Sequence, residues 1–162
     1  MEEINTSYAV RKLTTTDAKL YQNLWFKGLL EFPNAFVASL NEEKKLSLEM
    51  IEKRLTGEID VYGIFTSTTL VGILSLQHQA IEKRKHVGTI WGVYIDRDFR
   101  GKHLSKKLMK FVLDEAARNF DQVELYVNIQ GKVAIKLYEE LGFKTPLKKQ
   151  APLNKNLPCL RS

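Results

Sequence analysis

The sequence has little cysteine, no long apolar run and no metal-binding pattern. Cys159 is its one cysteine, so an intramolecular disulfide is excluded, and no Cys/His cluster has zinc-like spacing, so no metal is expected. Every apolar run falls short of the roughly 20 residues needed to span a bilayer. The stretch Met1–Asn5 lacks the basic and apolar regions of a signal peptide. We therefore expect a cytoplasmic protein with no membrane partner.

Two nucleotide-binding signatures are also missing. The sequence has neither a G-x-x-x-x-G-K-[ST] loop nor a G-x-G-x-x-G fingerprint, which leaves ATP and NAD chemistry without support. The net charge of +6 indicates an anionic partner, either nucleic acid or a phosphorylated cofactor, and only the placement of the cations can separate the two.

The composition and length predict one globular domain. The chain has 162 residues, of which 44% are hydrophobic and 27% charged, as is ordinary for a soluble domain. We expect the domain to cover residues 1–145. Residues 146–162 contain three of the four prolines and are predicted to be an irregular tail, as loop, edge strand or disorder.

The amino-terminal half predicts a strand followed by helices. Alternation over residues 8–13 indicates the strand, and the polar cluster of residues 14–17 can cap a helix that ends near Glu31, before Pro33. Ser47 is predicted to cap a short helix closed by Gly57. Residues 34–46 are predicted to be a loop or a ragged helical turn.

The remainder predicts a mixed α/β (α+β) fold. Runs at 59–66, 70–77 and 87–95 indicate an antiparallel meander, and residues 123–127 another strand. Apolar spacing predicts a helix over residues 104–116 and a last one that opens at Gly131 and ends at Gly142, an αL C-cap followed by Phe143. The order strand, helix, strand indicates a parallel pair joined by a crossover. We expect a mostly antiparallel twisted sheet flanked by about four helices.

The turn at residues 97–107 joins a strand to the clearest helix. The first N–H groups of a helix have no intrahelical acceptor and carry positive partial charge, so they can bind phosphate. Lys102, Lys106 and Lys107 crowd this positive end, which is unfavourable unless an anion offsets it. The alternative is that they are solvated lysines on an amphipathic helix.

This turn resembles the central motif of the GNAT family of N-acetyltransferases, R/Q-x-x-G-x-G/A between a strand and a long helix. Arg100 matches its first position, while His103 and Ser105 stand where the family usually has glycine, or glycine and alanine. Asn128 and residues 134–143 resemble the family's N…A-x-x-L-Y-E-x-L-G-F close. The likeness extends from about Val87 to Phe143, whereas residues 145–162 do not match the family's final β-hairpin.

The resemblance implies that acetyl-CoA is the co-substrate and lies between a fourth and fifth strand that run parallel and splay apart. Main-chain amides of the fourth strand would bind the pantetheine and stabilise negative charge on the thioester oxygen. The turn would bind the diphosphate, and Asn128 would contact the cofactor or the acetyl group. The implied cofactor-binding residues are Val93, Tyr94, Ile95, Arg100, Gly101, Lys102, His103, Leu104, Ser105, Lys106 and Asn128.

The resemblance also implies catalytic roles. Tyr138 matches the family's tyrosine that protonates the departing thiolate, although at helical spacing it also completes an apolar stripe. The base stays open between Glu31, His78 and His86. The aromatic residues that are candidates for an acceptor pocket are Phe32, Phe36 and Trp91.

The sequence therefore predicts an N-acetyltransferase that acts on a primary amine of a small molecule, peptide or protein by direct attack in a ternary complex. Its partners would be acetyl-CoA and the amine, with a homodimer as in many GNAT proteins. One alternative is a catalytically silent CoA-binding or regulatory module, suggested by His103 and Ser105. A nucleic-acid-binding domain rests on the net charge alone and is disfavoured, because no recognised motif accompanies it.

Overall fold

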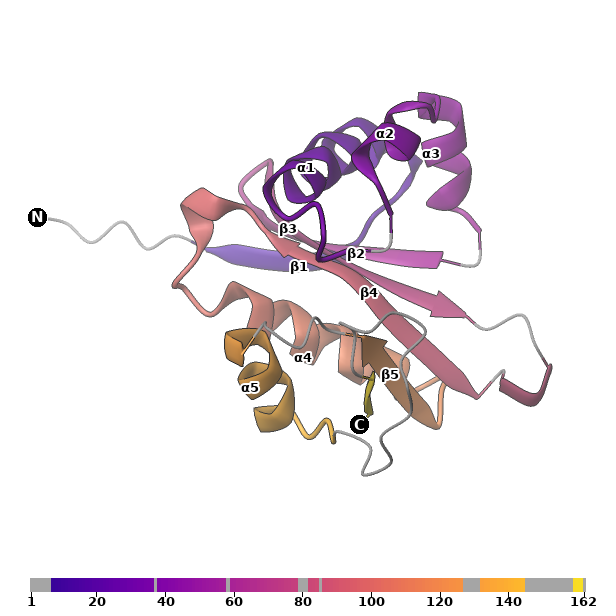
Figure 1. The fold of residues 1–162 in the computed structure, drawn as a ribbon, viewed down its shortest axis with the longest axis vertical. Helices are drawn as coiled ribbons and strands as arrows, with labels where there is room; N and C mark the ends of the chain where they lie inside the picture. The colour runs from indigo at the N-terminus through magenta and orange to yellow at the C-terminus, as the bar shows by residue number, and fades with distance from the viewer. Residues whose placement is uncertain are drawn as a thin grey trace, which may run out of the picture.

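A computed structural model describes residues 7–36, 38–57, 59–78, 82–84, 86–126, 132–144 and 159–161. Across these ranges one sheet of six strands runs in sequence order from β1 to β6. Helices α1, α2 and α3 lie on one face of the sheet, and α4 and α5 lie on the other (Figure 1). None of the helices in the described ranges has the length and apolar character of a membrane span.

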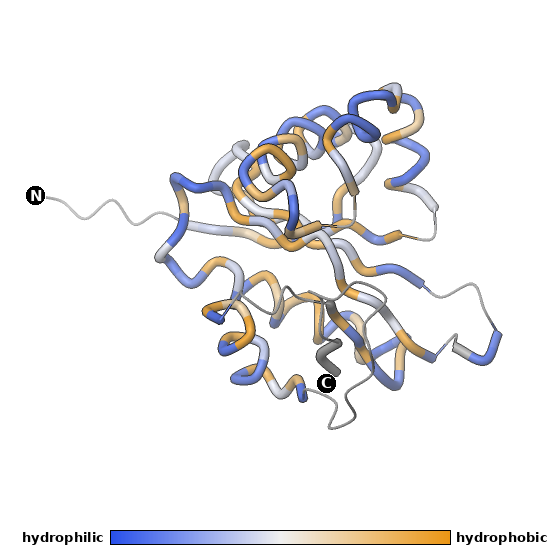
Figure 2. The backbone as a smooth tube through the Cα atoms, viewed as in Figure 1, coloured by the Kyte–Doolittle hydropathy of each residue, from blue (hydrophilic) through white to orange (hydrophobic). Residues whose placement is uncertain are grey.

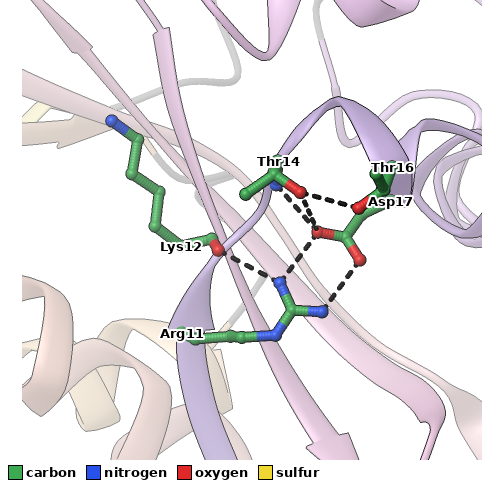
Figure 3. A network of polar contacts seen from close by, with 5 residues as sticks. All are labelled: Arg11, Lys12, Thr14, Thr16 and Asp17. Carbon is green, nitrogen blue, oxygen red and sulfur yellow. Dashed lines mark hydrogen bonds and ion pairs between the residues drawn. The ribbon is translucent and has the colours of Figure 1, made fainter.

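The chain enters the sheet at β1 (Tyr8–Lys12) and turns through η1 (Thr15–Asp17) into α1 (Ala18–Glu31). Asp17 fixes this corner, because its carboxylate accepts two hydrogen bonds of 2.8 Å from the Arg11 guanidinium and one of 2.7 Å from the Thr14 N–H (Figure 3). These bonds, that from Arg11 foremost, lower the Asp17 pKa to about 2. The predicted capping cluster therefore also anchors β1 to the helical layer.

Two short helices follow, and each is capped by a serine. Ser39 Oγ accepts from the Glu42 N–H at the start of α2 (Leu40–Lys44), and the predicted cap Ser47 accepts from the Met50 N–H at the start of α3 (Leu48–Arg54). Helix α2 lies in the stretch predicted as a loop or ragged turn. It is why the described residues contain five α-helices where about four were expected.

The central strands β2 (Ile59–Thr66), β3 (Thr69–His78) and β4 (Val87–Ile95) form the predicted antiparallel meander. Strand β5 (Gln122–Tyr126) runs parallel to β4, as the crossover through α4 (Leu104–Ala116) requires. Strand β6 (Cys159–Arg161) pairs antiparallel with β5, so the tail contributes an edge strand, one of the three forms expected for it.

Helix α5 (Lys132–Glu140) ends in a Schellman motif. Gly142 adopts a φ of 98°, its N–H donates to the Glu139 carbonyl, and the Phe143 N–H donates to the Tyr138 carbonyl. The Phe143 and Tyr138 rings meet edge to face at 6.1 Å. The prediction that Gly142 is an αL cap is thus confirmed, whereas Gly131 lies outside the described residues.

Apolar side chains pack on both faces of the sheet. Stretches of the central strands are correspondingly coloured as hydrophobic (Figure 2). One cluster packs strand residues such as Ile64 and Ile90 against Leu108 and Met109 of α4. The other packs Ile73 and Tyr94 against α1, around Trp25, which is 1% exposed. Any site in the sheet is therefore enclosed by helices on both sides.

Candidate functional site

Strands β4 and β5 separate halfway along β4. They pair from Val87 with Gln122 to Ile90 with Leu125, and within the described residues no strand adjoins β4 on that side beyond Ile90. On its other side β4 stays paired with β3, but one extra residue between Trp91 and Tyr94 makes a β-bulge. Gly92 supplies the φ of 64° at this bulge. The β5-facing edge of β4 is therefore without a partner strand among the described residues where Val93, Tyr94 and Ile95 lie.

The turn after β4 leads to a helix start without a side-chain cap. Gly101 and His103 both adopt left-handed φ, 79° and 58°, and His103 is the N-cap residue of α4 but makes no side-chain hydrogen bond to it. The first turn of α4 contains no acidic residue. Lys107 N–H donates to the His103 carbonyl at 3.1 Å, so the N–H groups of the three preceding helical residues remain without intrahelical acceptors. This is an anion-binding geometry.

The predicted cationic side chains of this turn point in different directions. Lys102 and Lys107 reach β1, where their Nζ atoms lie 3.4 Å from Tyr8 Oη and 2.6 Å from the Tyr8 carbonyl oxygen. Lys106 is half-buried and makes no polar side-chain contact with the described part of the chain. Lys106 is thus the lysine of this turn best placed for a ligand.

Arg100 binds the body of the protein. Its Nε donates to the Ile95 carbonyl at 3.1 Å, and its Nη2 lies 2.7 Å from Glu31 Oε1 at the end of α1. Tyr94 Oη donates to the same Glu31 oxygen at 2.8 Å. These contacts, with that from Arg100 the largest, lower the Glu31 pKa. A second ion pair, Lys27 with Asp96 at 3.1 Å, also joins α1 to this turn.

Tyr138 is buried in the cluster between the sheet and α4, with an exposed fraction of 6%. Burial raises its pKa to about 12, so its hydroxyl stays protonated at every physiological pH. It shares this cluster with Ile95 and Leu104, which border the turn between β4 and α4. Asn128 lies outside the described residues.

The two histidine candidates for the base lie toward the opposite end of β4 from the bulge. His78 pairs with Gly88, its ring packs on Phe120 at 5.0 Å, and its Nε2 lies 2.9 Å from Asp60 Oδ2. The His86 carbonyl accepts from the N–H groups of residues 121 and 122, at the start of β5. Neither ring is positioned beside the open edge of β4.

An aromatic cluster borders the bulge on the α1 side. The Trp25 ring meets Phe36 at 4.9 Å and Trp91 at 6.0 Å, both edge to face. The Nε1 atoms of both tryptophans are buried and have no hydrogen-bond partner among the described residues. Two predicted pocket residues, Phe36 and Trp91, are thus brought together, whereas Phe32 packs separately against Tyr94 and Arg100.

Glu124 was not among the predicted site residues. It lies in β5 with an exposed fraction of 2% and is paired in register with Thr89 of β4. Its neighbours Val123 and Leu125 pack into the α4-side cluster, so strand alternation directs Glu124 to the α1 side of the sheet. The available signal was the glutamate in the middle of an alternating strand that pairs with the fourth strand.

The acetyltransferase (GNAT) family model matches residues 25–143, and the chain belongs to that family. An uncharacterized N-acetyltransferase of Methanocaldococcus jannaschii is 24% identical over 142 residues. That match covers 85% of this chain and 61% of the relative, so the chain spans about three fifths of the relative's length.

Solved structures share the fold at low sequence identity. A GNAT-family acetyltransferase from Streptococcus pneumoniae has a TM-score of 0.77 at 15% identity, covering 96% of this chain and 98% of that one. PaiA N-acetyltransferase from Thermoplasma acidophilum, solved with coenzyme A, has a TM-score of 0.74 at 18% identity, with the same coverage. YncA from Salmonella typhimurium, solved with its cofactor acetyl-CoA, has a TM-score of 0.73 at 17% identity, covering 96% and 92%.

Proposed function

We propose that this protein transfers the acetyl group of acetyl-CoA to a primary amine by direct attack in a ternary complex. The observation that carries the proposal is the uncapped start of α4 beside the open edge of β4. Free helix-start amides attract a diphosphate, and free strand amides can hydrogen-bond the pantetheine arm. Coenzyme A carries both groups, and two solved structures of this fold hold coenzyme A or acetyl-CoA.

In this proposal the main chain does most of the cofactor binding. The amides of residues 101–106 hold the diphosphate, and Lys106 adds a cation that has no competing partner in the described part of the chain. The side chain of Arg100 braces the turn against Glu31 and Ile95, so we assign it to holding the turn and not to binding the phosphate. The main chain of Val93, Tyr94 and Ile95 borders the thioester.

Tyr138 supplies the proton that the sulfur takes as the C–S bond breaks. Its raised pKa keeps the phenol protonated, so the proton is in place when the thiolate leaves. Burial supports this assignment as well, because a hydroxyl removed from water transfers its proton to the bound group in preference to solvent.

Glu31 is better suited to positioning than to proton transfer. Its carboxylate is occupied by Arg100 and Tyr94, and its lowered pKa makes it a weaker proton acceptor. We therefore assign Glu31 to holding the turn and leave the base to another group. The aromatic cluster of Trp25, Phe36 and Trp91, on the α1 side of the bulge, forms one wall of the proposed amine site.

Calorimetric titration with acetyl-CoA and a turnover assay with a panel of primary amines test the proposal together. We expect acetyl-CoA to bind and at least one amine to be acetylated without a covalent acetyl-enzyme. Failure of acetyl-CoA to bind would refute the assignment of the turn. Binding without turnover on any amine would instead support a silent CoA-binding module, which the strained His103 in the binding turn also favours.

A further inference from the structure

The α1 side of the central strands carries a row of polar residues at the level where β4 and β5 are still paired. Antiparallel register places Gln77 of β3 beside Thr89 of β4, and parallel register places Glu124 of β5 on the other side of Thr89. The three therefore share one face of the sheet. A carboxylate that is 2% exposed stands at the end of this row, immediately before the strands separate.

The polar row borders the aromatic cluster. Trp91 lies two residues beyond Thr89 on the same face of β4, a rise of about 7 Å at 3.3 Å per residue. The buried Nε1 atoms of Trp25 and Trp91 have no hydrogen-bond partner among the described residues. Because buried donors are almost always paired, these two N–H groups call for polar atoms supplied by a ligand or by water.

Other ionisable groups constrain how Glu124 can act. Arg161 stands opposite Glu124 in the β5–β6 register, and Tyr126 lies two residues further along β5. The pair His78 and Asp60 lies on the opposite face, with Tyr62 and Phe120. Glu124 is thus the one carboxylate that the described strands place on the α1 side next to the separation of β4 and β5.

We propose that Glu124 binds the ammonium group of the acceptor and takes its proton, directly or through one water. This assignment rests on the proposed function and names the acceptor class as a primary amine that arrives protonated. A buried carboxylate favours an ammonium over a hydroxyl or an aromatic amine, since the ammonium brings a positive charge as well as hydrogen-bond donors to it. The aromatic wall then packs against the carbon chain of the amine and offers its face to the cation.

The proton balance is complete without another reactant. The ammonium gives one proton to the Glu124 carboxylate, and the freed lone pair forms the C–N bond. The C–S bond breaks with its electrons on sulfur, which takes the Tyr138 proton. The second nitrogen proton restores the Tyr138 hydroxyl, and Glu124 releases its proton to solvent, giving an amide, free CoA and one proton.

The test compares Glu124→Gln, Glu124→Asp, Glu31→Gln and the exposed control Glu140→Gln with the wild type. Turnover is followed from pH 6 to pH 10 with n-butylamine, putrescine, 2-phenylethylamine and a dipeptide with a free amino terminus. We expect Glu124→Gln to bind acetyl-CoA normally and to lose about 10²- to 10⁴-fold in kcat/KM at pH 7. The loss should shrink as pH rises toward the pKa of the amine, because the free amine needs no base. A merely structural defect would not recover in this way.

The other variants separate the alternatives. Glu124→Asp should have intermediate turnover, and the pH at which its rate rises should differ from that of the wild type. Glu31→Gln should keep the shape of the wild-type pH profile. Glu140→Gln should match the wild type in both rate and profile. A Glu124→Gln profile with the wild-type shape overturns the assignment and leaves the proposed function intact. Glu124→Gln could also lose acetyl-CoA binding, and Glu124→Asp then decides. If the pH profile of Glu124→Asp is not displaced from that of the wild type, the assignment of Glu124 as the base is wrong. If the wild type binds acetyl-CoA but neither binds nor acetylates any of these amines, both the Glu124 assignment and the proposed acetyl transfer are refuted.

Discussion

His103 occupies a backbone position that suits glycine, and His103→Gly should therefore stabilise the protein. Its φ of 58° lies in the left-handed region, which costs a residue with a Cβ about 1–2 kcal/mol. Glycine removes this cost but loses roughly 0.5–1 kcal/mol more conformational entropy on folding. The expected net gain is about 0.5–1 kcal/mol.

That gain corresponds to a measurable change in melting temperature. For a protein of this length, about 1 kcal/mol shifts the Tm by roughly 2–4 °C, so we expect a rise of about 1–4 °C. Circular dichroism during heating, without ligand, measures it. Calorimetry with CoA measures the second expectation, that affinity stays equal or increases, because glycine keeps the backbone N–H and removes a side chain from the turn.

Ser67 offers a matched control. It has a φ of 53° in the two-residue connection between β2 and β3, well separated in the chain from the α4 turn. Ser67→Gly should raise the Tm by a similar amount and leave CoA affinity unchanged. If Ser67→Gly stabilises the protein and His103→Gly does not, the reasoning about strain in the turn is wrong. If His103→Gly weakens CoA binding, the histidine ring itself contributes to the site.

Three further outcomes follow from the same structure. Tyr138→Phe should lower kcat and leave acetyl-CoA affinity nearly unchanged, and unaltered turnover would remove Tyr138 from the acid role. Lys106→Ala should weaken CoA binding by calorimetry, with Lys44→Ala on the exposed end of α2 as a control that binds normally. Asp17→Asn should lower the free energy of unfolding by about 1 kcal/mol at pH 7, after discounting for the half-exposed Arg11. Because the folded pKa of about 2 lies below the ordinary aspartate pKa of 3.8, that difference in urea denaturation should vanish as the pH falls from 4 to 2.

Local signals in the sequence predicted the elements on either side of the turn between β4 and α4. Ser47 and Gly142 act as the caps that their residue types indicate, and the apolar spacing of residues 104–116 gives α4 its observed bounds. Such signals depend on a few neighbouring residues, so they survive in any context. The crossover through α4 then determined that β4 and β5 run parallel.

Features that depend on tertiary contacts were harder to predict. Leu20 and Leu30 fit the helical spacing of α1, yet they are 42% and 72% exposed, while Gln22 on the buried face is 8% exposed. The bulge at Gly92 needs the register with β3, which no local pattern encodes. Predicting the place of Glu124 requires knowing which face of β5 is covered by α4. Alternation in the sequence shows only that Glu124 points away from Val123 and Leu125, and not which helices cover either face.

Contacts with α1 hold both the end of β4 and the turn that follows it. Glu31 holds Arg100 and Tyr94, while Lys27 holds Asp96, so the end of α1 is bonded to both ends of the segment from Tyr94 to Arg100. The Phe32 ring under the Arg100 guanidinium, 5.3 Å away, adds a cation–π contact on the same side. A turn braced in this way keeps its left-handed residues in place without a glycine at position 103. This bracing explains how the uncapped start of α4 is held in place although His103 and Ser105 depart from the family motif.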